Sequence, residues 1–303
     1  MVLFDEYLNG VKEVEKLGFD CNNPQFIPEW YLEQKQFIVW RTCHSYGDWI
    51  LISAMPRLLK EKYPDCTVAI PSPKCIATKY NPKNWLNRSK DPFNNVVDVF
   101  INNPYVDGMI DELPANMPVF HDHFRIYDPA NLDILIVEQM LKYWRFDAKT
   151  ITDSAPEMYW SEEEIKEGNE VIKKTFGKDD FGFLYIDDSF YVIDEEKRIP
   201  RMNVKRQLIQ SKIDEFSNLP WLYYAGTNIN ETVYRTNTKS IDVRDLKISL
   251  RIQSYIKSKS KVVIGHQGGY GTDCVSRYTT CYVIPLYSPA INEHYIRTTK
   301  YIR

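Results

Sequence analysis

The chain has 303 residues, more than a usual single domain, so two domains are the default expectation. Its 44% hydrophobic and 26% charged residues describe an ordinary soluble globular protein. A formal net charge of −3 argues against broad, non-specific affinity for nucleic acid.

Cysteine spacing and hydropathy indicate the compartment. The six cysteines form no C-x-x-C pair and no zinc-type spacing, so we expect buried, reduced thiols. Residues 1–20 lack the basic segment and apolar run of a signal peptide, and no apolar stretch approaches the roughly 20 residues that span a bilayer. We therefore expect a cytoplasmic protein without a membrane span. The cysteines are Cys21, Cys43, Cys66, Cys75, Cys274 and Cys281.

The first half of the chain is organised around residues 37–64. Residues 37–40 are apolar or aromatic and predict a short, buried, parallel strand, which a polar turn follows. From Trp49 onward the apolar positions fall largely on one face of a helix that ends at Tyr63-Pro64. These positions are Trp49, Ile50, Ile52, Met55, Leu58 and Leu59.

Asp48 stands at the carboxyl end of this strand and at the start of this helix. Open α/β sheets bind their ligands at that edge, so Asp48 is a candidate general base facing a cleft. The alternative is a helix N-cap, where Asp is common because its carboxylate accepts hydrogen bonds from free N–H groups. Residue type alone favours the cap, and the general base needs support from elsewhere in the chain.

Further elements of the first half follow the same alternation. An amphipathic helix is expected over 5–17, a β-branched strand over 66–71 and a third strand over 96–101. Residues 71–95 hold several Pro and Asn and predict a loop with short helical pieces. A short strand at 119–120 and a helix over 131–143 complete this half.

The second half begins after a linker over 147–160. Ser161 and the three glutamates after it form a capping box that opens a helix, which Gly177 ends after residue 176. Strands are expected over 181–187, 221–225, 261–265 and 281–287, with a short strand or turn at 241–243. Helices are expected over 204–216, 249–257, 272–278 and 292–303.

Strands that alternate with helices in both halves predict an α/β protein with two doubly wound parallel sheets facing each other across a cleft. We place an N-terminal domain over 1–150 and a C-terminal domain over 151–290. The terminal helix, 291–303, could return to the N-terminal domain.

A glycine-dense segment follows the predicted strand 261–265. Its four glycines within seven residues allow a sharp turn and a close approach to a ligand. Thr272 could cap the next helix, whose free N–H groups suit a phosphate, while His266 and Gln267 could contact the ligand. The alternative is a tight turn that binds nothing. The candidate donor-binding residues here are Gly265, His266, Gln267, Gly268, Gly269, Gly271 and Thr272.

Two further polar segments are candidates. The basic loop 195–207 includes Arg201 and Lys205, leads into a helix start and could hold a diphosphate, unless it is a solvated charge run. His121, His123 and Arg125 follow the short strand at 119–120. Because no further ligands occur at suitable spacing, we expect no metal there, and an acceptor-binding or plain loop role instead.

Several segments together resemble the heptosyltransferase family, glycosyltransferase family 9, in the same order over about residues 37–290. They include Gly47-Asp48 before an apolar helix, Asn103-Pro104-Tyr105 after the third strand and the 155–164 linker into a helix. Val262 to Gly269, followed by the strand at 281–287, completes the pattern. Each match is short, and their order carries the resemblance.

The resemblance implies a GT-B fold, with two Rossmann-like domains, and an inverting transfer of sugar from a nucleotide-diphosphate donor to a hydroxyl acceptor without a metal. It implies Asp48 as the catalytic base and Gly268 beside the diphosphate. The family's Lys falls on Arg201 or Lys205, which the pattern does not distinguish. His44 joins His121, His123 and Arg125 as a candidate for acceptor binding.

The chain departs from the family pattern in the glycine-dense segment. His266-Gln267-Gly268 replaces the usual Asp-Thr/Ser-Gly, and Gly271 replaces a later His. Donor identity is therefore open, and two alternatives remain. One is a GT-B enzyme that acts on a protein or nucleobase, and the other is a nucleotide-sugar-binding protein that has lost turnover. A dinucleotide oxidoreductase is disfavoured because no G-x-G-x-x-G follows the first strand.

Overall fold

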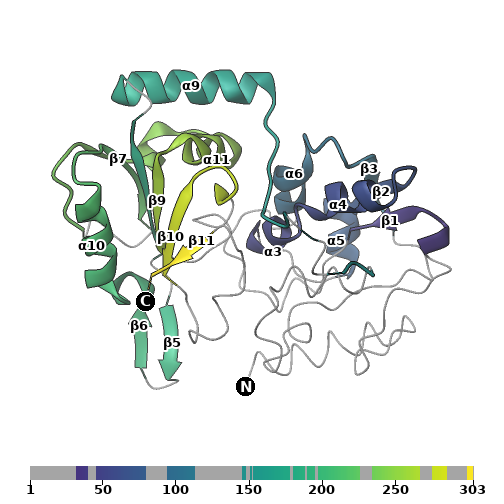
Figure 1. Ribbon diagram of the computed structural model, residues 1–303, viewed down its shortest axis with the longest axis horizontal. Coiled ribbons are helices and arrows are strands. Elements are labelled where there is room, and N and C mark those ends of the chain that lie inside the picture. Colours follow the sequence, from purple (N-terminus) through teal and green to yellow (C-terminus); the bar gives the residue numbers. More distant parts are fainter. Residues whose placement is uncertain are drawn as a thin grey trace. The chain divides into compact units, whose positions relative to one another are not determined.

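The computed structural model divides into two compact units, Met1–Ser154 and Ala155–Arg303, each with its own parallel sheet (Figure 1). The sequence-based boundary fell at residue 150. Side-chain and backbone statements below concern the residues that the structure describes: 32–39, 46–79, 94–112, 145–147, 151, 153–177, 180–187, 190–194, 197–225, 234–266, 275–284 and 299–302.

The first unit contains a described three-stranded parallel sheet of order β1-β2-β3. Its strands are β1 (Gln36–Ile38), β2 (Thr67–Pro71) and β3 (Gly108–Ile110). Phe37 lies opposite Val68, and both side chains are buried. The strands predicted over 37–40 and 66–71 are therefore confirmed, because their apolar residues pack into the core of this unit.

The apolar helix predicted from Trp49 onward is two helices, α3 (Tyr46–Leu51) and α4 (Met55–Lys62). Pro56 explains the break, because it lacks an N–H and its ring clashes with the carbonyl of the residue four positions earlier. It is tolerated only because it lies in the first turn of α4. The apolar positions predicted for one face are all buried: Trp49, Ile50, Ile52, Met55, Leu58 and Leu59.

The third strand predicted over 96–101 is wrong, because these residues form helix α6 (Asn95–Phe100). Val96, Val99 and Phe100 are buried at helical spacing, whereas Ile101 is 56% exposed just after the helix. The hydrophobic period of this segment outweighs the strand propensity of its valines. The third strand of the sheet is instead β3, inside the segment interpreted as a turn-rich connection.

Helix α5 (Pro73–Lys79) is one of the short helical pieces expected within 71–95. Ser72 precedes it at the carboxyl end of β2, and its hydroxyl accepts a hydrogen bond from the Cys75 N–H at 3.1 Å. The same hydroxyl donates to the Asp111 carboxylate at 2.6 Å, just after β3. This hydrogen bond raises the acidity of Asp111, so its pKa lies below the usual value.

The second unit contains a described six-stranded sheet of order β11-β10-β9-β4-β7-β8, in which every pair is parallel. Strands predicted over 181–187, 221–225, 261–265 and 281–287 are confirmed as β4, β7, β9 and β10, and that at 241–243 lies within one residue of β8. The strands are β4 (Gly182–Ile186), β7 (Trp221–Ala225), β8 (Ser240–Asp242), β9 (Val262–His266), β10 (Thr280–Ile284) and β11 (Thr299–Tyr301).

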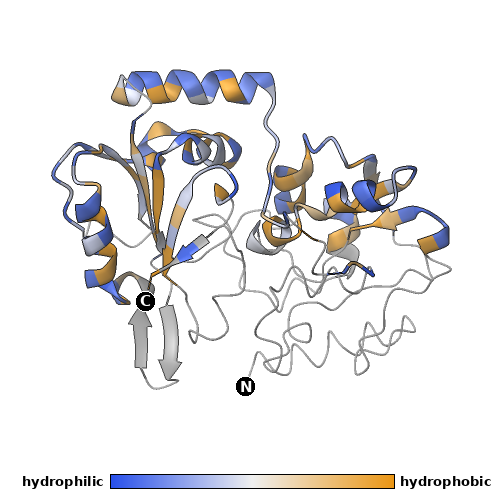
Figure 2. Cartoon of the chain, viewed as in Figure 1, coloured by the Kyte–Doolittle hydropathy of each residue, from blue (hydrophilic) through white to orange (hydrophobic). Residues whose placement is uncertain are grey.

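Helices cover both faces of this sheet. Leu184 and Ile186 of β4 pack in one buried cluster with Ile209 of α10 (Arg206–Glu215). The ammonium group of Lys257 in α11 (Leu250–Lys259) stands 5.4 Å from the ring centre of Phe183. Because side chains alternate across a strand, α10 and α11 lie on opposite faces, as a doubly wound sheet requires (Figure 1 and Figure 2).

Helix α9 (Glu162–Phe176) begins and ends where the sequence predicts. The hydroxyl of Ser161 accepts from the Glu164 N–H, and the Glu164 carboxylate accepts from the Ser161 N–H, which completes the capping box. Gly177 ends the helix with a left-handed backbone. A Cβ on Gly168 would lie 2.3 Å from the ring of Tyr255, so α9 packs very closely on α11.

Two expectations for the second unit are wrong. The basic loop contains an antiparallel hairpin of β5 (Phe190–Asp194) and β6 (Lys197–Pro200), whose pairing satisfies backbone groups that a loop would leave to water. The terminal helix over 292–303 does not form in its described part, since residues 299–301 are strand β11, paired with β10 of the second unit. Ile302 is buried in the same core cluster, which ties this segment to the second unit.

The connecting segment is held at both ends. Arg57 of α4 donates to the carbonyl oxygen of Asp153 at 2.9 Å, within the first unit. Arg277 donates to the carbonyl oxygen of Ala155 at 3.3 Å and forms an ion pair with the buried Glu157 at 3.1 Å, within the second unit. The part of the chain that the structure describes includes no helix long and apolar enough to cross a bilayer.

Cys66, Cys75 and Cys281 are buried, reduced thiols, as expected, and burial raises the pKa of Cys66. Cys21, Cys43 and Cys274 lie outside the described residues, as do the elements predicted over 5–17, 119–120 and 131–143.

Candidate functional site

The topology of the second sheet identifies one ligand-binding edge. The chain leaves β4, adds β7 and β8 on one side, and then returns to add β9, β10 and β11 on the other. The direction of strand addition therefore reverses between β4 and β9. In open α/β sheets, ligands bind at the carboxyl ends of the strands beside such a switch point.

His266 lies at this switch point, as the last residue of β9. Its ring is fully buried, and Nδ1 accepts a hydrogen bond of 3.0 Å from the N–H of Asp187, the residue after β4. An accepting Nδ1 carries no proton, so the neutral ring carries its proton on Nε2. The bond joins the carboxyl ends of the two strands and fixes the point at which the glycine-dense segment begins.

Gly265 brings β9 against β4. A Cβ at this position would lie 2.0 Å from the carbonyl oxygen of Tyr185, and no side chain fits there without moving β4. The glycine predicted to allow a close backbone approach does so toward a neighbouring strand. Its role in this structure is to let the two strands of the switch point pack together.

Other candidate donor-binding residues lie outside the described part of the chain: Gln267, Gly268, Gly269, Gly271 and Thr272. Of the helix predicted over 272–278, the described residues from Val275 onward form turns, in which the N–H groups of Tyr278 and Thr279 both bond to the carbonyl of Val275.

Arg201 and Lys205 come directly before α10. Arg201 lies in a short 3₁₀ turn, η3 (Arg201–Asn203), and Lys205 has a left-handed backbone with φ of 50° at the start of α10. Since α10 follows β4 and leads to β7, two parallel strands, its first turn lies toward the carboxyl edge of the sheet. The structure thus brings Lys205 toward the edge that carries His266.

Asp48 is the third residue of α3, so its interpretation as the helix N-cap is wrong. It still lies in the first turn after β1, at the carboxyl edge of the first sheet. Its role as a general base stays a prediction. His44, His121, His123 and Arg125 lie outside the described residues.

The structure brings together a group of side chains that the sequence did not single out. Tyr185 of β4 and Tyr224 of β7 stack with their ring centres 5.6 Å apart and their planes 11° apart. The guanidinium of Arg244, in η4 (Val243–Leu246), stands 5.9 Å from the ring centre of Tyr224. Asp242 holds Arg244 through hydrogen bonds of 2.9 Å to Nε, which raise the pKa of the guanidinium. The sequence signal was an Asp-x-Arg at the end of a strand.

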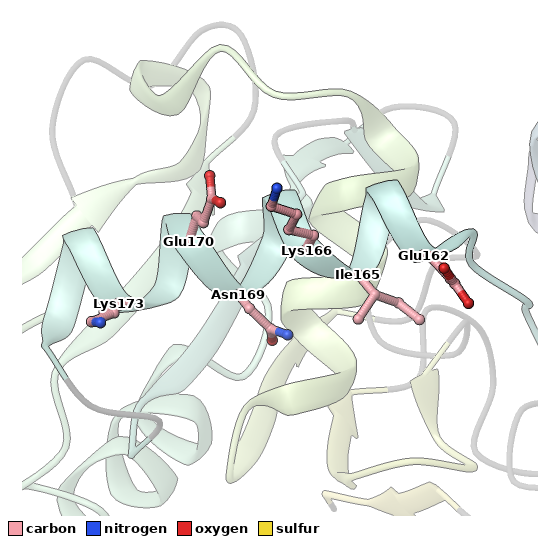
Figure 3. Close-up of a pocket in the computed structure, with 6 residues that line it drawn as sticks. All are labelled: Glu162, Ile165, Lys166, Asn169, Glu170 and Lys173. Atoms are coloured by element: carbon pink, nitrogen blue, oxygen red, sulfur yellow. The ribbon is translucent and has the colours of Figure 1, made fainter.

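Two hollows in the described residues carry no comparable signal. One, of about 400 Å³, lies along the surface of α9 alone (Figure 3). Its lining mixes charges of both signs, and none of it comes from the end of a strand: Glu162, Ile165, Lys166, Asn169, Glu170 and Lys173. The other, of about 310 Å³, lies in the first unit and includes Arg57, Glu61 and Asp153. Among described residues no three His, Cys, Asp or Glu side chains converge on a metal position.

No protein-family profile and no curated protein matches this chain. Solved structures do. The glycosyl transferase family 9 protein of Veillonella parvula DSM 2008 is 12% identical, with a TM-score of 0.55 over 88% of this chain and 85% of that protein. The ADP-heptose lps heptosyltransferase II of E. coli is 11% identical, with a TM-score of 0.50 over 88% of this chain and 90% of that protein. The predicted resemblance is confirmed at the level of fold: the chain has the fold of family 9 glycosyltransferases.

Proposed function

We propose that this protein is an inverting, metal-independent glycosyltransferase of GT-B architecture, which moves a sugar from a nucleotide-diphosphate donor to a hydroxyl acceptor. The observation that carries the proposal is the His266–Asp187 hydrogen bond at the switch point of a doubly wound sheet, directly before a glycine-dense segment. The fold shared with two glycosyltransferases supports it.

The second unit would bind the donor. His266 would hold the start of the segment Gln267–Thr272 at the carboxyl edge, so that its backbone N–H groups can bond a diphosphate. Arg201 and Lys205, before α10, would neutralise the charge that develops on the leaving nucleotide. Such preorganised stabilisation of developing charge is often the largest single contribution to catalysis.

The first unit would bind the acceptor. Asp48 would remove the proton from an acceptor hydroxyl as its oxygen attacks the anomeric carbon, from the face opposite the leaving diphosphate. The carbon–oxygen bond to the diphosphate breaks as the new glycosidic bond forms, and the configuration inverts. General-base catalysis of this kind accelerates a reaction roughly 10²–10⁴-fold. His44, His121, His123 and Arg125 are our candidates for acceptor contacts.

Nucleotide release from ADP-sugars and UDP-sugars, with the purified protein and EDTA present, tests this function. We expect slow hydrolysis that EDTA does not change. Asp48→Asn should remove turnover and keep nucleotide binding, measured as a thermal shift. Asp65→Asn, which changes an exposed carboxylate of the same unit, is the matched control and should keep full turnover.

The outcomes separate the alternatives. Binding without any turnover would favour the nucleotide-sugar-binding protein, an alternative that the departures at His266 and Gly271 motivate. Full turnover in Asp48→Asn would exclude the proposed base. Absence of both binding and turnover would overturn the glycosyltransferase assignment.

A further inference from the structure

Four side chains at the carboxyl ends of β4, β7 and β8 form a continuous shelf. Tyr185 and Tyr224 lie opposite each other in the register of β4 and β7, which places both rings on one face of the sheet, where they stack. Arg244 extends the stack over Tyr224. We call these residues, with Asp242, the tyrosine–arginine shelf.

Asp242 makes the shelf rigid. One of its oxygens accepts from the Arg244 N–H and from Arg244 Nε, each at 2.9 Å, and the other accepts from Nε and Nη2. The Asp242 side chain is 10% exposed, whereas 37% of the Arg244 side chain remains exposed. The guanidinium plane is therefore fixed by a nearly buried carboxylate while the group itself stays accessible.

Charge and shape point to one kind of ligand. Asp242 compensates the charge of Arg244, so the pair has little net attraction for a phosphate. What remains is a flat guanidinium above two flat rings, a surface that suits stacking by a planar heterocycle. Stacking on such platforms tolerates different bases, because every base has a π-face.

The shelf lies at a suitable distance from the switch point. Tyr224, on β7, is two strands away from His266, on β9. At about 4.8 Å between neighbouring strands, the separation is about 10 Å along the carboxyl edge. A nucleoside diphosphate that places its phosphates beside the segment after His266 can extend its base toward β7 and β8.

We propose that the tyrosine–arginine shelf binds the base of the nucleotide-sugar donor by stacking, with Arg244 as the main contact. This inference rests on the proposed function and adds the residues that recognise the nucleoside part. It implies that the protein tolerates changes of base better than loss of the base.

Calorimetric titration of the full chain with ADP, UDP and inorganic pyrophosphate tests the inference. Arg244→Ala should weaken ADP binding roughly tenfold, as expected for one lost stacking contact, and leave pyrophosphate binding unchanged. Arg244→Lys keeps the charge but not the flat face, so it should behave like Arg244→Ala. Arg235→Ala, at an exposed arginine of the same unit, is the control and should bind ADP like the natural sequence.

A second substitution guards against misfolding, since removal of Arg244 leaves Asp242 without its ion-pair partner. Tyr224→Leu removes the ring beneath the guanidinium and should also weaken ADP binding, whereas Tyr224→Phe should not. Circular dichroism of each variant confirms that the sheet is intact.

The possible results are distinct. Equal ADP affinity in Arg244→Ala and the natural sequence would overturn the shelf and leave the proposed function intact. Recovery in Arg244→Lys, or an equal loss of pyrophosphate binding, would show a phosphate contact and overturn stacking. A natural protein that binds neither nucleotide nor pyrophosphate would overturn both proposals.

Discussion

The carboxyl edges of the two sheets use the same device for different ends. In the first unit, Ser72 donates to Asp111 across the ends of β2 and β3. In the second unit, the Asp187 N–H donates to His266 across the ends of β4 and β9. Both bonds tie the ends of neighbouring parallel strands, yet only one of them lies at a switch point.

The segments after β2 and β9 explain the difference. The Ser72 hydroxyl also accepts from the Cys75 N–H, so its bonding capacity is used to start α5. His266 leads instead into a glycine-dense segment, where backbone N–H groups can serve a ligand. A polar pair at the edge of a sheet therefore indicates a ligand site only together with the strand order.

The largest expected effect compares one glycine from each sheet. Gly265→Ala would place a Cβ 2.0 Å from the Tyr185 carbonyl, and Gly108→Ala meets nothing within 4 Å. We expect Gly265→Ala to lower the free energy of unfolding by more than about 3 kcal/mol, because backbone of β4 must move. Gly108→Ala should change it by less than about 1 kcal/mol. Urea denaturation measures both, and similar values would contradict the close approach of β9 to β4.

Nucleotide binding should separate the two polar pairs. We expect His266→Ala to weaken ADP binding by at least about tenfold, because the Asp187 N–H loses its acceptor and the start of the ligand segment is no longer fixed. Ser72→Ala should leave ADP affinity unchanged. Calorimetric titration of both variants decides the matter, and an unchanged affinity in His266→Ala would remove the switch-point site.

Stability should show the opposite pattern for Ser72. Ser72→Ala removes the acceptor of the Cys75 N–H and should cost about 1 kcal/mol of unfolding free energy. It also removes the hydrogen bond that lowers the pKa of Asp111, so this pKa should rise toward its usual value. NMR titration of the Asp111 carboxyl follows the shift, with Asp65 as an internal reference. A constant Asp111 pKa would mean that Lys74, 3.4 Å away, determines it instead.

The smallest effect concerns pH. Burial opposes the ionisation of Asp107, but hydrogen bonds from Lys60 and the Val68 N–H outweigh it and hold the pKa of Asp107 below its usual value. Its contribution is therefore present above the unfolded pKa near 3.9 and is lost as the pH falls through the lower folded pKa. Because the pair is partly exposed, we expect Asp107→Asn to cost about 0.5 kcal/mol at neutral pH.

Unfolding of Asp107→Asn and the natural sequence at several pH values checks this expectation. The difference between the two proteins should disappear in strong acid. Glu112→Gln, an exposed change nearby, should show no such dependence, and a difference that persists in acid would mean that packing rather than charge is lost.

Local signals made part of the fold predictable. Helix α9 has both of its ends encoded in the chain, by Ser161 with Glu164 and by Gly177, and its limits were predicted correctly. Helix α6 lacks a side-chain cap, and its short apolar run suits a strand equally well. The tertiary packing of Val96, Val99 and Phe100 decided between the two structures, and no local pattern shows that packing.

The same distinction applies to the candidate site. Gly265 and His266 were found because glycine density and strand–helix alternation are visible along the chain. The stack of Tyr185, Tyr224 and Arg244 joins three segments that are far apart in sequence, so only the strand order reveals it. Strand β11 was missed for a similar reason, because its partner β10 decides its conformation.

The grip of two arginines on the connecting segment has a mechanical consequence. Arg57 holds the carbonyl of Asp153 for one unit, and Arg277 holds the carbonyl of Ala155 for the other. Between these two anchored peptide groups lies a single residue, Ser154. Any reorientation that keeps both anchors must be absorbed by the torsion angles around this one position, which makes residue 154 the pivot of the molecule.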